Sequence, residues 1–387
     1  MSNKEIYLDN SATTRVHPEV TALVRKIMEE DYGNTSSLHR KGMEAEQYIR
    51  DAREQLAKIL KVSEKEFIFT SGGTESDNLA IIGAALANRR AGNHIITSAV
   101  EHAAVAASVR ALEEFGFTFT ILPVDATGRV NPEDLRKAIT DETILVSIMY
   151  VNSETGAVQP IEELAKVIKE TKPSVLFHVD AIQAFGKYHI YPSRIGIDLL
   201  AVSSHKFHGP KGAGFLYVSP RTKLHPLIFG GGHQGGMRSG TENVPGVAGM
   251  ALAATETYDH MEEKVAHMRS LKNHFVEEIG KIDGTVINGL TDEQSAPHII
   301  SVSFENVRSE VLLHTLESEG IYVSAGSACS SNKPTVSATL TAMGVKMPWL
   351  EETLRFSFCE DTTLEEVDAA LDCLRRNLPL LRRFVRK

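Results

Sequence analysis

Lys206 is the first residue whose position suggests chemistry. It lies in the segment VSSHKFHGPKG, directly after an apolar run at 198–203 that predicts a β-strand. Ligands of parallel sheets bind beyond the carboxyl ends of the strands, and a partly desolvated lysine there can form a Schiff base with an aldehyde. On sequence statistics alone, a solvated loop lysine is the more common case. His205 and His208 flank Lys206 without a matching set of metal ligands, so we predict no metal site.

Asp180 and Gln183 follow another strongly apolar run, in HVDAIQAFG. A buried carboxylate needs a cationic or hydrogen-bonding partner. A protonated pyridine nitrogen would be such a partner, and the aspartate would strengthen that ring as an electron sink. The alternative is that Asp180 caps a following helix, and this segment alone favours the cap.

A glycine-rich turn connects a predicted strand at 66–70 to a predicted helix in FTSGGTESDNLAI. Gly73 lets the backbone approach a phosphate, and Thr74 lies where a helix N-terminus offers unpaired N–H groups and a favourable dipole. The segment matches neither GxxxxGK[ST] nor GxGxxG, so it predicts no nucleotide P-loop and no Rossmann fingerprint. A glycine turn with a capping Ser or Thr explains the same residues.

His102 and Asn152 each follow a further predicted strand, in SAVEHAAV and YVNSETG. A histidine at this edge of a sheet can stack on a flat cofactor and move protons, and an asparagine can bond a ring oxygen. A structural histidine and a turn-forming asparagine are the usual roles of such residues. Polar groups therefore follow five predicted strands. Because the carboxyl ends of parallel strands lie at one edge of the sheet, we predict a ligand site at that edge.

Cys329 lies in SAGSACSS, among small residues that offer it little packing. The chain has three cysteines, at 329, 359 and 373, and none of them forms a CxxC motif. Because their number is odd, they cannot all form disulfides within one chain. A reducing cytosol fits this usage, so we expect a cytoplasmic protein. The segment alone leaves open whether Cys329 is a working thiol; the other two cysteines are expected to be packing residues.

Alternating strand and helix patterns are expected to position these residues. Apolar runs predict strands at 66–70, 94–98, 117–123, 143–151, 174–180, 198–203 and 214–218, and NPEDLRKAIT and IEELAKVIKE predict helices between them. This rhythm predicts an α/β fold with a mainly parallel sheet. The composition changes after 230–246, so we place a large α/β domain at 16–254 and a smaller α+β domain at 1–15 plus 255–387. The segment LDNSATT is expected to pack near the active site.

Charge and hydropathy exclude several classes of protein. The 387 residues hold 41 Lys and Arg against 50 Asp and Glu, a net charge of −9 without a block of either sign, so nucleic acid is not an expected partner. No run of about 18 apolar residues predicts a membrane span, and the first residues contain no apolar export signal.

Taken together, the motifs resemble those of a fold-type I pyridoxal phosphate enzyme, and more narrowly a NifS/IscS-type cysteine desulfurase of the class V aminotransferase-like group. The resemblance covers nearly the whole chain. The stretches that carry it are YLDNSATT, GNTSSLH, TSGGTESDN, TSAVEH, VNSETG, HVDAIQ, SSHKFHGPKG, GGGHQGGMRSGT, SAGSACSS and LRFSF.

The resemblance implies a role for each matching residue. Lys206 resembles the lysine that holds pyridoxal 5'-phosphate as a Schiff base, and Arg355 resembles the arginine that binds the substrate carboxylate, with Asn34 a weaker match to the same end of the substrate. Thr241 resembles a phosphate ligand from the second subunit of a homodimer. The remaining matches contact the cofactor: Asp180 at the ring nitrogen, His102 stacked on the ring, Gln183 and Asn152 near its phenolic oxygen, and Gly73, Thr74, Ser203 and His205 around the phosphate.

The implied reaction converts L-cysteine to L-alanine. Lys206, helped by His102, would move protons, and the Cys329 thiolate would attack the substrate sulfur to form a persulfide. The sulfur acceptor stays open between an iron–sulfur scaffold and a tRNA-thiolating enzyme, because many relatives extend beyond the LRRFVRK end with a docking tail. Thr35 and Ser153 also depart from the family pattern, at positions that are not catalytic.

Two alternatives remain open at this point. A selenocysteine lyase, or another aminotransferase-like relative, would use the same cofactor site on a different substrate. A non-catalytic binding protein could keep the fold, although the combination of Lys206, Asp180, His102 and Cys329 argues against it.

Overall fold

The computed structural model describes residues 5–325 and 336–384 of the chain. Cys329 therefore lies outside the described residues. Within them, no helix combines the length and the apolar character that a membrane crossing requires.

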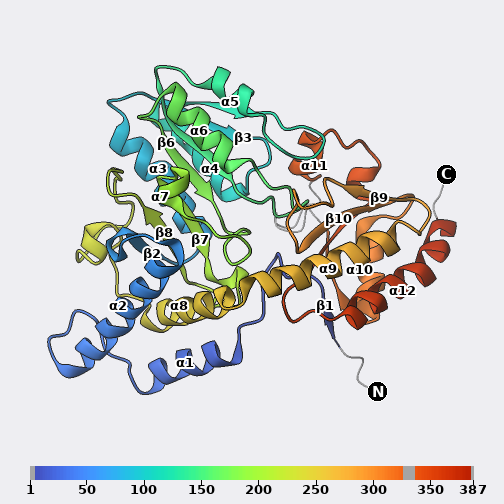
Figure 1. Ribbon diagram of the computed structural model, residues 1–387, viewed down its shortest axis with the longest axis horizontal. Helices are drawn as coiled ribbons and strands as arrows, with labels where there is room; N and C mark the ends of the chain where they lie inside the picture. The colour runs from blue at the N-terminus through green and yellow to red at the C-terminus, as the bar shows by residue number, and fades with distance from the viewer. Residues whose placement is uncertain (1–4, 326–335, 385–387) are drawn as a thin grey trace.

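A large sheet forms the centre of the first part of the molecule (Figure 1). Its strand order is β2-β8-β7-β6-β5-β3-β4. The five strands from β7 to β4 are parallel, and β8 and β2 are antiparallel to their neighbours. The predicted mainly parallel sheet is therefore confirmed. The strands are β2 (Phe67–Thr70), β3 (His94–Ser98), β4 (Thr118–Leu122), β5 (Thr143–Met149), β6 (Leu176–Asp180), β7 (Leu199–Ser203) and β8 (Gly214–Val218).

Helices cover both faces of this sheet, which explains why its strands read as continuous apolar runs. Successive residues of a strand point to opposite faces, so Ile95 packs in one core cluster and Ile96 in another. The face of Ile95 is covered by α3 (Gly73–Asn88) and α4 (Ala103–Ala111). The opposite cluster contains residues of α1 (Pro18–Glu29), α2 (Arg40–Leu60), α5 (Pro132–Ala138), α6 (Ile161–Thr171) and α8 (Val244–Tyr258); the short α7 (Pro192–Ile195) lies between β6 and β7.

The rest of the chain forms a second sheet with its own apolar core. The order is β12-β13-β10-β9, with a separate pair of β1 and β11. Ile6 and Leu8 join this core, so the N-terminal residues pack with the C-terminal part. The elements are β1 (Ile6–Tyr7), α9 (Met261–Ile279), β9 (Thr285–Asn288), β10 (Ile299–Phe304), α10 (Ser309–Ser318), β11 (Ile321–Tyr322), β12 (Ser324–Ala325), α11 (Ala338–Ala342), β13 (Thr353–Ser357) and α12 (Leu364–Leu381).

The proposed domain boundary after residue 254 falls inside α8, which ends at Tyr258. In Figure 1, α9 runs from the large sheet towards the small one. The division into 16–254 and 1–15 plus 255–387 stays a prediction.

Between α3 and β6 the structure buries a carboxyl group that the sequence analysis did not single out. Both carboxyl oxygens of Asp77 are buried without a hydrogen bond. The nearest partner is Nε2 of His178, at 3.5 Å from Oδ1, and Nδ1 of that histidine bonds Ser147 Oγ at 2.8 Å. Burial, followed by the charges of Asp180 and Glu101, raises the pKa of Asp77 well above its usual value. Burial also lowers the pKa of His178 to about 3, so its ring is neutral near pH 7.

Replacing Asp77 with Asn is therefore expected to stabilise the protein. The unfolded chain releases the Asp77 proton near pH 4, whereas the folded chain retains it, so wild-type stability falls as pH rises above about 4. The variant lacks this penalty, and we expect a gain of about 1–3 kcal/mol at pH 7 that shrinks towards pH 5. Denaturant unfolding at both pH values measures it. The exposed Asp283→Asn is the matched control and should change little; a gain of equal size in both variants contradicts the explanation.

Candidate active site

Lys206 lies at the carboxyl end of β7, in the 3-10 turn Ser204–Lys206. Its Nζ atom donates to the carbonyl oxygens of Ser11 and Ala12 at 2.6 and 2.8 Å. Thr14 of the same N-terminal segment bonds the chain on both sides of the lysine, through the carbonyl of His205 and the amide of His208. The expectation that LDNSATT packs beside the lysine is therefore confirmed.

Asp180 ends β6, the strand adjacent to β7, and is buried. Its Oδ1 accepts from the backbone N–H of Ile182 at 2.9 Å, so the carboxylate stabilises a turn rather than a helix. Burial raises its pKa, whereas this hydrogen bond and the positive charges of His102 and Lys206 lower it. Asp180, His102 and Lys206 interact electrostatically at one edge of the sheet, where the sequence analysis placed them.

The turn between β2 and α3 forms an open helix N-terminus beside β7. No side chain caps α3, so its first N–H groups are available to a ligand. Gly72 has a φ of 146°, and a Cβ added to it would lie 3.5 Å from Ser203 Oγ. At Gly73 an added Cβ would meet Ile182 Cδ1 at 2.1 Å, so a larger residue there would force the Ile182 side chain to move. Thr74 is exposed on the first turn of the helix. These groups form a cradle of a kind that binds anions.

The other predicted cofactor residues lie around this edge, and each also has a structural role. His102 is exposed and caps α4, since its Nδ1 accepts from the amide of Ala104 at 3.1 Å. Asn152 is buried; its Oδ1 accepts from the amides of Glu154 and Thr155, and its Nδ2 donates to the carbonyl of Val100.

Gln183 and His205 bond the N-terminal segment that covers the lysine. Gln183 Nε2 donates to the carbonyl of Ser11 at 2.9 Å, and His205 Nδ1 lies 3.2 Å from Thr13 Oγ1. Burial, followed by the charges of Lys206 and Lys211, lowers the pKa of His205 to about 4, so that its ring is neutral near pH 7. The structural roles of these four residues, His102, Asn152, Gln183 and His205, do not prevent them from contacting a cofactor as well. Their contacts with a cofactor stay predictions.

Arg355 brings the second part of the chain to the same edge. It lies on β13 with 4% of its surface exposed; Nη1 donates to the carbonyl of Ser153 at 2.9 Å and Nη2 pairs with Asp9 Oδ1 at 2.7 Å. Its Nε is buried without a hydrogen bond. The sequence analysis missed Asp9 as a partner, although it lies within the LDNSATT stretch.

Both described ends of the segment that carries Cys329 are attached near Arg355 and Asn152. Ser324 pairs with Arg355 where β12 meets β13, one residue before the described chain stops at Ala325. After the chain resumes, Ser337 Oγ donates to Glu154 Oε2 at 2.5 Å and Thr339 Oγ1 lies 3.4 Å from Asn152 Nδ2. Cys329 follows Ala325 by four positions in the sequence and lies outside the described residues.

Two predicted site residues lie in another neighbourhood. Asn34 and Thr241 are exposed. Asn34 accepts from the amide of Ser36, whose hydroxyl lies 3.3 Å from His233, so the α1–α2 connection contacts the glycine-rich segment that contains Thr241. Neither side chain forms a hydrogen bond with the described residues around Lys206.

A cluster of potential metal ligands lies behind the lysine. His17, His208 and Glu360 place ligand atoms within 4.8 Å of one another. The members already have protein partners, because His17 lies 3.0 Å from Glu256 and 3.5 Å from Glu360, and Glu360 pairs with the ammonium of Lys264 at 3.2 Å. We describe the cluster as an ionic network, and the expectation of no metal site stays a prediction.

Comparisons with known proteins agree with this geometry. The family model for aminotransferase class V matches residues 6–370. A protein named cysteine desulfurase IscS from Dictyoglomus turgidum is 43% identical over 98% of this chain and 96% of its own length. Among solved structures, a NifS-like protein has a TM-score of 0.92 at 38% identity over 97% of this chain and 100% of its own. The structure titled SspA in complex with cysteine has a TM-score of 0.81 at 33% identity, over 93% and 100%.

These matches span nearly the whole chain and include the sheet edge that holds Lys206, Asp180 and His102. They also confirm the predicted fold class, a large mainly parallel α/β sheet with a smaller α+β part. The chain therefore belongs to the class V aminotransferase family and, within it, to the cysteine desulfurases of the IscS/NifS type.

Proposed function

We propose that this chain is a cysteine desulfurase that converts L-cysteine to L-alanine and carries the released sulfur on Cys329. The observation that carries the proposal is the attachment of both ends of the 326–335 segment beside Arg355 and Asn152. The described chain therefore enters and leaves the segment that carries Cys329 beside these two residues. Relatives named as cysteine desulfurases, and a neighbour titled as a complex with cysteine, support the choice of substrate.

Pyridoxal 5'-phosphate is the cofactor that we propose for this edge of the sheet, and three features fit it. The uncapped N-terminus of α3, with Gly73, Thr74 and Ser203, fits a phosphate; His205 and the partner subunit's Thr241 would complete that set. The buried Asp180 fits a protonated ring nitrogen, and Lys206 fits the aldehyde carbon. When bound, this cofactor supplies an electron sink for the carbon from which a proton is removed.

The chain's own groups supply binding and proton transfer. Arg355 holds the substrate carboxylate by a bidentate contact, in exchange for its present partners Asp9 and Ser153. Lys206, with His102 as its helper, removes the proton from the substrate Cα and returns protons to the product. Asn152, Gln183 and His102 fix the ring's orientation.

The proposed sulfur transfer needs no oxidant other than the substrate itself, because the electrons of the broken Cβ–S bond stay on carbon. The Cys329 thiolate attacks the sulfur of the substrate, the S–S bond forms, and the Cβ–S bond breaks with its electron pair on carbon. That carbon takes a proton and leaves as alanine, while Cys329 retains the sulfur as a persulfide. Delivery to an acceptor protein restores the thiol.

We further propose a homodimer, because Asn34 and Thr241 are exposed together in a neighbourhood that a second copy could bring to the site. The acceptor is proposed to be an iron–sulfur scaffold or a tRNA-thiolating enzyme in the cytoplasm. Direct contact with nucleic acid or membrane is not part of the proposal.

Replacing Cys329 with Ser tests the sulfur carrier. We expect the variant to bind pyridoxal phosphate with an unchanged absorption band and to lose sulfur transfer at least about 100-fold, because a hydroxyl cannot supply the thiolate. Alanine release and mass spectrometry of the cysteine-treated protein measure this. Cys373→Ala is the matched control, since that thiol is buried in the small core. A persulfide on Cys359 or Cys373 instead of Cys329 would contradict the assignment of Cys329 as the sulfur carrier. Alanine release from selenocysteine but not from cysteine would favour a selenocysteine lyase.

Replacing Arg355 with Lys tests the substrate carboxylate contact. The lysine keeps the charge but loses the bidentate geometry, so kcat/KM for cysteine should fall about 10- to 100-fold, mainly through KM. Steady-state kinetics measure the split. Asp9→Asn is the companion variant, because it removes the ion pair that competes with the substrate and should leave KM equal or lower. An unchanged KM in Arg355→Lys contradicts this role.

A further inference from the structure

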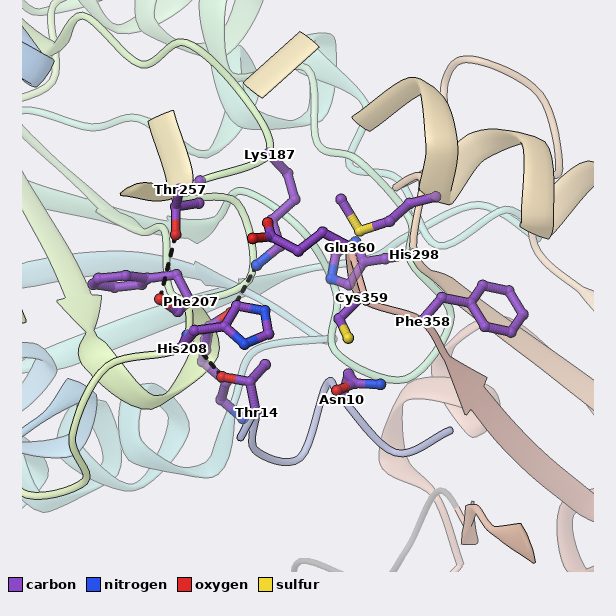
Figure 2. A pocket seen from close by; sticks show the side chains of 13 residues that line it. Asn10, Thr14, Lys187, Phe207, His208, Thr257, His298, Phe358, Cys359 and Glu360 are labelled. Carbon is purple, nitrogen blue, oxygen red and sulfur yellow. Dashed lines mark hydrogen bonds between the residues drawn. The ribbon is translucent and has the colours of Figure 1, made fainter. Parts of the chain in front are cut away.

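Lys206 is one of the residues that line a small cavity, and Figure 2 shows other side chains around this cavity. It is closed by the segment after β7, by the N-terminal segment and by the residues that follow β13. The lining groups that carry charge or can titrate are Lys187, Lys206, His208, His298, Cys359 and Glu360. The proposed reaction uses only Lys206 among them, so the other groups need a separate explanation.

Lys187 reaches into this cavity and contacts the main chain of Lys206. Its Nζ atom donates to the Lys206 carbonyl oxygen at 2.7 Å. Among residues 5–325 and 336–384, no carboxylate forms an ion pair with Lys187. Burial lowers the pKa of this ammonium to about 8, and the charges of Glu360 and Cys359 oppose that shift.

Such a placement costs stability. A lysine usually leaves its ammonium in water, and enclosing it without an ion pair is unfavourable. The folded pKa lies below the unfolded value of about 10.4, so the penalty is present below about pH 8 and disappears as pH rises above the unfolded value. Buried ionisable groups whose pKa is strongly shifted commonly have a functional role when they lie beside an active site.

The hydrogen bonds around Lys206 indicate what that role is. Thr14 holds the carbonyl before the lysine and the amide two residues after it. Thr257 Oγ1 donates to the carbonyl of Phe207 at 3.4 Å. The carbonyl of Lys206 itself is held by a charged donor, and a charge-assisted hydrogen bond is about twice as strong as a neutral one.

We propose that Lys187 is a positioning residue for Lys206: its ammonium fixes the lysine's carbonyl and thereby the direction in which the side chain leaves the 3-10 turn. This inference rests on the proposed function, because it assigns Lys187 a role in that reaction. Lys187 acts through Lys206 and touches neither substrate nor cofactor.

The ammonium also sets the charge of the cavity. The groups that face it are Glu360, Cys359, His208 and His298, from three different parts of the chain. Glu360 pairs with Lys264, at 3.2 Å. Burial, followed by the charge of His17, lowers the pKa of His208 to about 4, and burial with the charge of Lys187 lowers the pKa of His298 well below its usual value. Both rings are therefore neutral near pH 7. Lys187 therefore carries the titration that occurs near pH 8 in this cavity.

Two variants of Lys187 test the proposal in the full-length holoenzyme. Lys187→Met keeps the four-atom stem of the lysine side chain but has no donor. Lys187→Arg keeps the donor and the charge at every accessible pH. For Lys187→Met we expect kcat to fall about tenfold with little change in KM, the loss of one charged hydrogen bond. The decline of wild-type kcat above about pH 8 should be absent from this variant and should move at least about one pH unit higher in Lys187→Arg.

Hydrogen exchange of the cofactor-free protein gives a readout that needs no activity. The amides of Phe207 and Gly209 bond the carbonyl of Ser204, so a peptide covering 204–209 reports opening of this turn. Lys187→Met should exchange faster there than wild type, and Lys187→Arg should not. Exchange in α12, in the other core, is the internal control.

The outcomes separate this inference from the proposed function. If wild type releases no alanine from cysteine, the proposed function fails, while the exchange comparison still decides whether Lys187 holds the Lys206 turn. Unchanged exchange in Lys187→Met, or an alkaline limb that is the same in wild type and Lys187→Arg, overturns the positioning role. If Lys187→Met does not fold, the Lys187→Arg pH profile decides alone.

Discussion

The hydrogen bonds between the N-terminal segment and the end of β7 are the constraint on which the site depends. Ser11 and Ala12 accept from Lys206, Thr14 holds the residues on either side of it, and Gln183 donates to Ser11. The same segment belongs to the other core, through Leu8, and bonds Ser357 at the end of β13. One stretch of chain thus joins both sheets at the lysine, and a shift of either sheet must move the lysine's surroundings.

Around this junction the protein retains polar groups that its stability does not favour. Asp77 and His178 are buried beneath Asp180, and Lys187 lies behind Lys206. Burial shifts the pKa of each towards its neutral form. Burial also raises the pKa of Asp180, and its interactions with His102 and Lys206 oppose that shift. Asp180 is the carboxyl group that we propose to face the cofactor ring, whose protonated nitrogen would favour its ionised form.

Several residues at this edge serve the fold and the site together. His102 caps α4 through Nδ1 and leaves its ring exposed, and Asn152 closes a turn while holding the loop after β3. A structural role for such a residue therefore does not exclude a role in the site. A side chain that backbone contacts already fix loses little further conformational entropy when it binds a ligand. Residues with such a structural role are therefore well suited to ligand binding as well.

The strand and helix pattern, the parallel sheet and the edge at which Lys206, Asp180, His102 and Asn152 gather were all predictable, because apolar periodicity determines strands and parallel strands end on one side. The family motifs added the cofactor and Cys329. What the sequence could not indicate is which distant groups meet: Asp9 with Arg355, Asp77 with His178, and Lys187 with the carbonyl of Lys206. The first contact depends on how two separate cores pack around the N-terminal segment, and the other two depend on how helices, strands and loops of the large part pack together. Local patterns of apolar and polar residues carry no information about such tertiary contacts.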